Sequence, residues 1–188
     1  MRWRDTPIGY GWVSIGLHWL TAALVLVMLF VGNSIPSDKG FNLDKLRLHT
    51  SLAFVSYTAL WFRIWWRFKD GHPGPLARQN RTYFAIGKAL HFLLLIALAA
   101  MLASGPVMAW TGGYPIQVFS LFTVPSPLPL SPAIFDFSRK IHIAAATTLA
   151  LGVALHICGS AKHFFIDNDG AIDRMLIAAG TPKKEPRP

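Results

Sequence analysis

Residues 140–163 read KIHIAAATTLALGVALHICGSAKH, and the part between the two lysines, with a histidine toward each end, decides the fold. No Lys, Arg, Asp or Glu lies between Lys140 and Lys162. A membrane-spanning helix needs about 20 predominantly apolar residues, so the stretch predicts such a helix. Inside it, His142 and His156 are the ionisable exceptions, and ionisable side chains in lipid are costly unless they face the interior of a bundle.

The same shortage of charge recurs along the chain. Of its 188 residues, 53% are hydrophobic and 14% are charged, whereas a typical soluble domain has about 25% charged residues. Charges are also absent between Asp5 and Asp38 and between Lys88 and Asp136. An ordinary soluble domain and a disordered chain are thereby excluded. We expect an all-α fold, a transmembrane four-helix bundle, with helices at residues 12–31, 46–66, 85–108 and 138–164.

Basic residues between the apolar stretches predict the orientation. Cytoplasmic segments carry an excess of Lys and Arg, and 13 of the 18 such residues fall inside if the N-terminus is inside. Both termini are therefore expected in the cytoplasm, with lipid as a partner. The net charge of +9 follows this topology and forms no basic recognition helix, so we expect no nucleic acid partner. Residues 1–180 are taken as one domain and residues 181–188 as a disordered tail.

Histidines occur at two depths in the predicted bundle. His142 and His156 are 14 residues apart, which is about 21 Å along a helix axis and nearly four full turns, so both face the same side. In the second helix, His49 lies at the depth of His142. In the first, His18 lies at the depth of His156. The sequence therefore predicts two stacked histidine pairs, one near each membrane surface.

Paired histidines in an apolar bundle suit haem, because haem iron takes imidazole nitrogen at its axial positions. Iron with histidine on both sides has no free position, so it carries electrons and does not bind substrate. Cations near each surface can pair with the haem propionates, and small residues on the ligand-bearing helices allow a macrocycle close to the backbone or, equally, close helix packing. The cations are Arg47, Arg139, Lys140, Arg63 and Arg67, and the small residues are Gly16, Gly152 and Gly159.

Two other functions use the same features. A divalent-metal transporter can bind its ion through histidines, but it normally has intramembrane carboxylates or broken helices, and the predicted spans contain no Asp or Glu. The second alternative is that the chain is a cytochrome subunit that anchors a larger dehydrogenase or hydrogenase in the membrane.

Three features outside the pairs carry their own expectations. His91 lies at the inner depth and competes with His18 for the iron, bonds a propionate or bonds a neighbouring helix; the last two are favoured together. His72, in a loop rich in Gly and Pro, is expected to be solvated. Residues 116–122, in a proline-rich loop, are expected to form a short interfacial helix.

Several motifs resemble those of one family. Helix one opens with Leu17-His18-Trp19-Leu20 and helix two with Leu48-His49-Thr50-Ser51, and helix two closes with Arg63 and Arg67. Helix three has Lys88-Ala89-Leu90-His91, and helix four ends in KHFFIDNDG at residues 162–170. Together they resemble the prokaryotic four-helix cytochrome b561 family over residues 16–176.

The resemblance implies two haem b groups, with ligands at His18, His49, His142 and His156, in the inner membrane of a bacterium. It also implies an oxidoreductase that exchanges electrons with ubiquinone near His163. Some members look like superoxide oxidases, and the cations outside can steer an anion. Propionate pairing and headgroup contact are the favoured roles for those cations, which are Lys39, Lys45, Arg47, Arg139 and Lys140.

Overall fold

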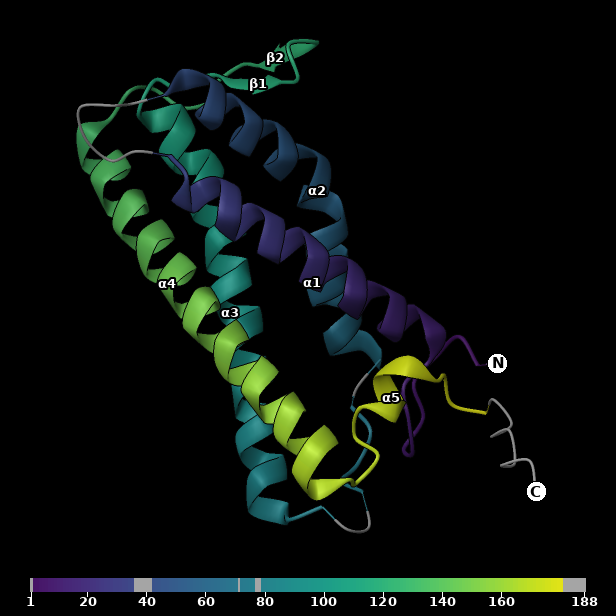
Figure 1. The fold of residues 1–188 in the computed structure, drawn as a ribbon. Coiled ribbons are helices and arrows are strands. Elements are labelled where there is room, and N and C mark those ends of the chain that lie inside the picture. Colours follow the sequence, from purple (N-terminus) through teal and green to yellow (C-terminus); the bar gives the residue numbers. More distant parts are fainter. Residues whose placement is uncertain (1, 36–41, 71, 77–78, 181–188) are drawn as a thin grey trace.

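Four long helices make up most of the chain in the computed structural model (Figure 1). The structure describes residues 2–35, 42–70, 72–76 and 79–180. The predicted all-α bundle is confirmed, and every helix extends beyond its predicted range at one end or both. The predicted disordered tail, residues 181–188, lies outside the described residues. The helices are α1 (Trp12–Asn33), α2 (Leu43–Asp70), α3 (Arg81–Thr111) and α4 (Pro132–Lys162).

Local sequence explains the ends of α3 and α4. The side chain of Asn80 accepts hydrogen bonds from the backbone N–H groups of Thr82 and Tyr83, and Ser131 accepts one from Ile134. Both residues are therefore helix N-caps, which satisfy backbone donors that have no partner inside the helix. Helix α3 ends at Gly112, and the next residue, Gly113, has a φ of 75°, a conformation that favours glycine.

Three helices of the described chain are long and apolar enough to cross a membrane: Trp12–Asn33, Arg81–Thr111 and the stretch Pro132–Asp167. The fourth, α2, has 28 residues but is less apolar, because Arg63 and Arg67 lie within it. Large apolar side chains face outward, as Phe30 and Leu151 do with 78% and 63% of their surface exposed. Such a surface suits lipid better than water.

The helices pack as two pairs. Helix α1 lies along α2, and α3 lies along α4 with the most extensive contact in the molecule. The two pairs meet at mid-height in one apolar cluster, in which Leu149 of α4 is only 4% exposed. That residue is seven positions from both His142 and His156, so the cluster separates the two histidine levels. Its buried members are Val25, Leu60, Ile64, Ala97, Leu98, Leu102 and Leu149.

A β-hairpin covers one end of the bundle (Figure 1). Strands β1 (Ile116–Val118) and β2 (Phe122–Val124) pair antiparallel, with Ile116 opposite Val124. The interfacial helix predicted at residues 116–122 is therefore wrong. The run alternates buried and partly exposed side chains, which fits a strand. The hydroxyl of the buried Ser51 of α2 accepts from the Phe119 N–H, and it lies 2.8 Å from the Gln117 carbonyl and 2.7 Å from the Arg47 carbonyl of its own helix.

Both chain ends meet at the opposite end of the bundle (Figure 1). The Arg2 N–H donates to the Ala179 carbonyl, and the Ala179 N–H donates to the Tyr10 carbonyl. An ion pair of 2.6 Å joins Arg4 to Asp70 at the end of α2. After α4 the chain forms a π-turn, η1 (His163–Asp167), and a short helix, α5 (Asp173–Leu176). We call this end the terminal end and the other the hairpin end.

Candidate haem sites

Each predicted histidine pair joins one helix pair of the bundle to the other. At the hairpin end, His49 of α2 faces His142 of α4, with ring centres 6.4 Å apart and ring planes at 78°. At the terminal end, His18 of α1 faces His156 of α4, with ring centres 6.0 Å apart and planes at 71°. The structure therefore brings together both pairs predicted from sequence depth. We call them the hairpin-end site and the terminal-end site.

The spacing of the rings matches two imidazoles on one metal ion. A metal–imidazole bond is about 2 Å long, and the ring centre lies about 1 Å from its nitrogen, so two rings on opposite sides of one ion have centres about 6 Å apart. Both measured separations agree with this value. The donor set, four neutral nitrogens at two levels without a carboxylate, suits haem iron.

An apolar cavity of about 340 Å³ adjoins the hairpin-end site. Its wall includes both rings, His49 and His142, with side chains from all four helices and from the hairpin. The Nδ1 atom of His49 is buried and has no hydrogen-bond partner among the described residues. A buried polar atom without a partner costs about 1–3 kcal/mol, which a group bound in the cavity can offset. This site therefore fits an apolar macrocycle with an axial imidazole.

Two glycines make room for the rings of the hairpin-end site. A Cβ on Gly32 would lie 3.2 Å from Cε1 of His49, and a Cβ on Gly105 would lie 3.3 Å from Cε1 of His142. Both separations are tighter than ordinary van der Waals contact, so a larger residue would push the ring. The three glycines named from the sequence do not lie against a histidine ring. Gly16 and Gly159 face open space, whereas Gly152 packs against Leu94 of α3.

Helix α3 holds the second nitrogen of His142. Ser104, which is 5% exposed, donates its one hydroxyl proton to the Ala100 carbonyl at 2.6 Å. Its oxygen lies 3.1 Å from Nδ1 of His142 and therefore accepts from that N–H. Nε2 of His142 is then the nitrogen with a free lone pair, which is the form a metal needs.

The terminal-end site has a third histidine. Nε2 of His91, on α3, lies 3.2 Å from Nδ1 of His156. Two nitrogens on opposite sides of one metal ion are about 4 Å apart, so this shorter separation is a hydrogen bond. The expectation that His91 bonds a neighbouring helix is confirmed by this contact.

The comparisons with known proteins agree with this geometry. The family model described as prokaryotic cytochrome b561 matches residues 9–177. The chain belongs to the prokaryotic cytochrome b561 family. It is also 31% identical over 179 residues to cytochrome b561 homolog 2 of Escherichia coli (strain K12), an alignment that covers 94% of this chain and 95% of that protein. This cytochrome b561 is a membrane protein, and its family implies haem b.

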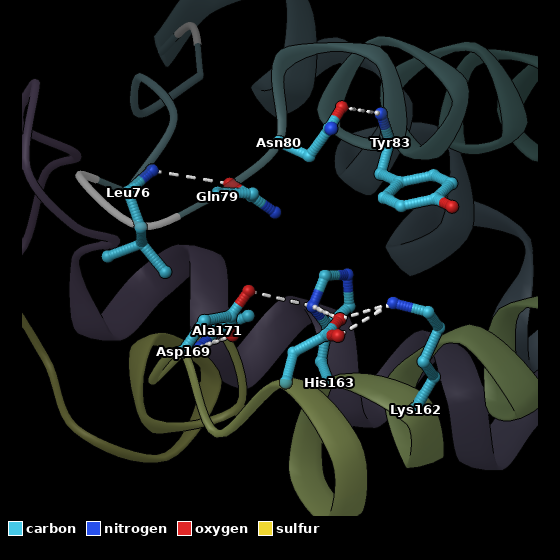
Figure 2. Close-up of polar contacts among 9 residues, drawn as sticks. Leu76, Gln79, Asn80, Tyr83, Lys162, His163, Asp169 and Ala171 are labelled. Atoms are coloured by element: carbon cyan, nitrogen blue, oxygen red, sulfur yellow. Dashed lines mark hydrogen bonds and ion pairs between the residues drawn. The ribbon is translucent and has the colours of Figure 1, made fainter.

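His163 of this cytochrome b561 lies at the terminal end in a polar network (Figure 2). Its Nδ1 is 2.8 Å from a carboxylate oxygen of Asp169 and 3.2 Å from one of Asp167. Lys162 pairs with Asp167 at 2.6 Å, and its ammonium lies 4.7 Å from the ring centre of Tyr83. The carboxylate of Asp169 therefore fixes the ring of His163 and leaves its Nε2 for another partner.

The predicted cationic residues fall at both ends. Arg63 and Arg67 are half-buried at the terminal end. At the hairpin end Arg47 is exposed and lines a small polar cavity with the hairpin residues Gln117 and Thr123. Arg139 is exposed on α4, one turn before His142. The cations can thus reach propionates at either site.

One predicted site neighbour behaves differently from expectation. His72 is not solvated: it is half-buried, with its Nδ1 2.9 Å from the Pro73 carbonyl and 3.2 Å from the Tyr10 hydroxyl. Burial first, and then the charge of Arg67, lower the pKa of His72 to about 4. Glycines and prolines around His72 suggested an exposed loop, but the N-terminal segment folds over it.

Sequence reasoning also missed Ser51, Ser104 and Gly32. A serine in an apolar helix is a weak signal, because most such hydroxyls bond only their own helix, as Ser56 does. Nothing in the sequence distinguishes Ser51 and Ser104 from Ser56. Their partners come from other helices or from the hairpin, so only packing reveals them.

Proposed function

We propose that this cytochrome b561 carries two haem b groups, one at each histidine pair, and passes electrons across the membrane. The observation that carries the proposal is the repeated ring separation, 6.4 Å for His49 and His142 and 6.0 Å for His18 and His156. Helix α4 supplies one member of each pair, which places the two sites in line along the bundle. Membership of a cytochrome family favours haem over the divalent-metal alternative.

When bound, haem b supplies an iron centre that gains and loses one electron. The chain itself binds the haems and separates the two sites with apolar side chains. Histidine on both sides leaves no open position for a substrate, and the apolar cluster around Leu149 excludes water between the levels. Arg63 and Arg67 at the terminal end, and Arg47 and Arg139 at the hairpin end, are the cations for the propionates.

The terminal end is the proposed place of electron exchange with ubiquinone. His163 lies seven residues beyond His156 along the same helical path, and its Nδ1 is held by the carboxylate of Asp169 at 2.8 Å. A histidine held in this way presents its Nε2 for a hydrogen bond with the oxygen of a quinone or quinol. The excess of Lys and Arg at this end supports the proposal that both termini lie on the cytoplasmic side of a bacterial inner membrane.

The hairpin end is the proposed entry point for electrons from outside. Arg47 and Arg139 are exposed there and attract an anion such as superoxide, or an acidic patch on a redox protein. A small anion that passes on an electron without binding the iron needs only to be attracted by these two arginines.

Absorption spectroscopy tests the two-haem proposal. Protein purified in detergent should show reduced b-type bands on addition of dithionite, and extraction should give two haems per chain. A colourless protein, or one haem per chain, would sink the proposal. Stopped-flow mixing with superoxide, with and without a ubiquinone analogue, then tests the donor. We expect superoxide to reduce the haems quickly and the quinone analogue to reoxidise them. If superoxide does not reduce the haems quickly, a redox protein is left as the donor.

A further inference from the structure

Helix α3 supplies none of the four proposed ligands, yet it contacts both histidines of α4. Ser104 bonds Nδ1 of His142 at 3.1 Å, and His91 bonds Nδ1 of His156 at 3.2 Å. These residues are 13 positions apart on α3, and the two α4 histidines are 14 apart. Because α3 and α4 make the most extensive contact between elements of the described residues, one helix face can reach both levels.

His91 is itself held in place from its other side. The ring of His72 lies 6.4 Å from that of His91, centre to centre, and the ring of His156 lies 4.9 Å away. His72 in turn is fixed by the Tyr10 hydroxyl and the Pro73 carbonyl. The loop after α2 therefore brings the ring of His72 beside that of His91.

We propose that His91 is a positioning residue for the terminal-end haem. Its Nε2 accepts the Nδ1–H of His156, which aims Nε2 of His156 at the iron and makes that nitrogen more basic. This inference rests on the proposed binding of haem at this site. Hydrogen bonds from a metal-bound histidine to a partner have both effects in general.

The two acceptors on α3 differ in strength. A neutral imidazole nitrogen is a stronger base than a serine hydroxyl oxygen, so it draws the shared proton further from its histidine. His156 therefore carries more negative charge than His142 and favours oxidised iron. His91 thus lowers the reduction potential of the terminal-end haem, whereas Ser104 has a weaker effect of the same sign at the hairpin end.

Redox titration of the purified holoprotein tests this role, with two variants at one position. His91→Leu removes the acceptor, and His91→Gln keeps an amide oxygen at a similar reach. We expect two haems per chain in both, an upward shift of the terminal-end potential in His91→Leu, and a return toward the wild-type potential in His91→Gln. Ser104→Ala is the matched control: it should move only the hairpin-end potential, and by less.

Electron paramagnetic resonance of the oxidised protein gives a second readout. The largest g value of the terminal-end haem depends on the angle between its two imidazoles, here 71°, and should change in His91→Leu because the ring of His156 is released. Unchanged potential and g value in His91→Leu would overturn the inference, as would equal loss of haem from both His91 variants. A wild-type protein with fewer than two haems defeats the two-haem proposal instead, and is distinguished by the haem count alone.

Discussion

The two histidine sites share one geometry but lie in different surroundings. At the hairpin end both rings lie against glycines, Gly32 and Gly105, beside an apolar cavity of about 340 Å³. At the terminal end Gly16 and Gly159 face open space, and Nε2 of His91 lies 3.2 Å from Nδ1 of His156. One site is therefore shaped by close packing and the other by polar groups.

The difference shows how one helix bundle can hold two haems at unlike potentials. Potentials of haem iron depend on hydrogen bonds to the ligands, burial and nearby charge, as well as on the ligands themselves. The ligands here are the same at both levels. Any difference in potential between the two haems must then come from the residues around them.

The largest effect is expected from removing a ligand. His142→Ala or His49→Ala should lose the hairpin-end haem, and His18→Ala or His156→Ala the terminal-end haem, so haem content falls from two per chain to one. Extraction and the reduced absorption bands measure this. Thr147→Ala, on the exposed face of α4, should keep two haems. If one histidine variant lost both haems, the sites would not be independent.

The next effect concerns the glycine behind His142. Gly105→Leu should displace the ring, because even a Cβ would come within 3.3 Å of it, and should lower haem content at the hairpin end alone. Gly87→Leu is the control on the same helix, since a Cβ there meets nothing within 4 Å. Equal haem loss in both variants would show that the effect is on helix α3 as a whole.

A smaller effect is expected at the hairpin. Ser51→Ala leaves the Phe119 N–H and the Gln117 carbonyl without their partner, which should lower the free energy of local opening there by about 1–3 kcal/mol. Hydrogen exchange over residues 116–124 measures it. Ser56→Ala is the matched control, because Ser56 is as buried but bonds only carbonyls of its own helix. Similar exchange in the two variants would contradict the role given to Ser51.

The smallest effect is the pH dependence of the terminal end. The pKa of His72 is lowered from 6.5 to about 4 by burial and by Arg67, so between these values the unfolded chain takes up a proton that the folded chain does not. Stability should therefore fall as pH drops from 6.5 toward 4, by less than about 1.4 kcal/mol per pH unit. The measurement is Tm in detergent from pH 7 to 5.

The control for this pH effect is His72→Gln, which should flatten the fall in Tm relative to wild type. Other titrating groups act equally in both proteins, so only the difference between the two curves reports on His72. Parallel curves would mean that His72 is protonated as easily in the folded chain as in the unfolded one.

Helix positions and histidine depth could be predicted because both depend on spacing along one chain. Uncharged runs of about 20 residues favour helices in lipid, and 14 residues between His142 and His156 return to the same face of any α-helix. The sequence-based predictions were wrong where a segment's contacts are with residues far away in the sequence. Residues 116–124 became a hairpin because Ser51 bonds their backbone, and His72 became buried because the N-terminal segment covers it.

The sequence by itself determined an all-α membrane bundle and its two levels of histidine, since apolar runs and helical periodicity are local properties. Tertiary structure alone decided what surrounds each level. Ser104, His91, Gly32 and Gly105 act on histidines of other helices, and which side chains meet across helices depends on how the pairs α1–α2 and α3–α4 come together. Packing therefore decided the difference between the two sites.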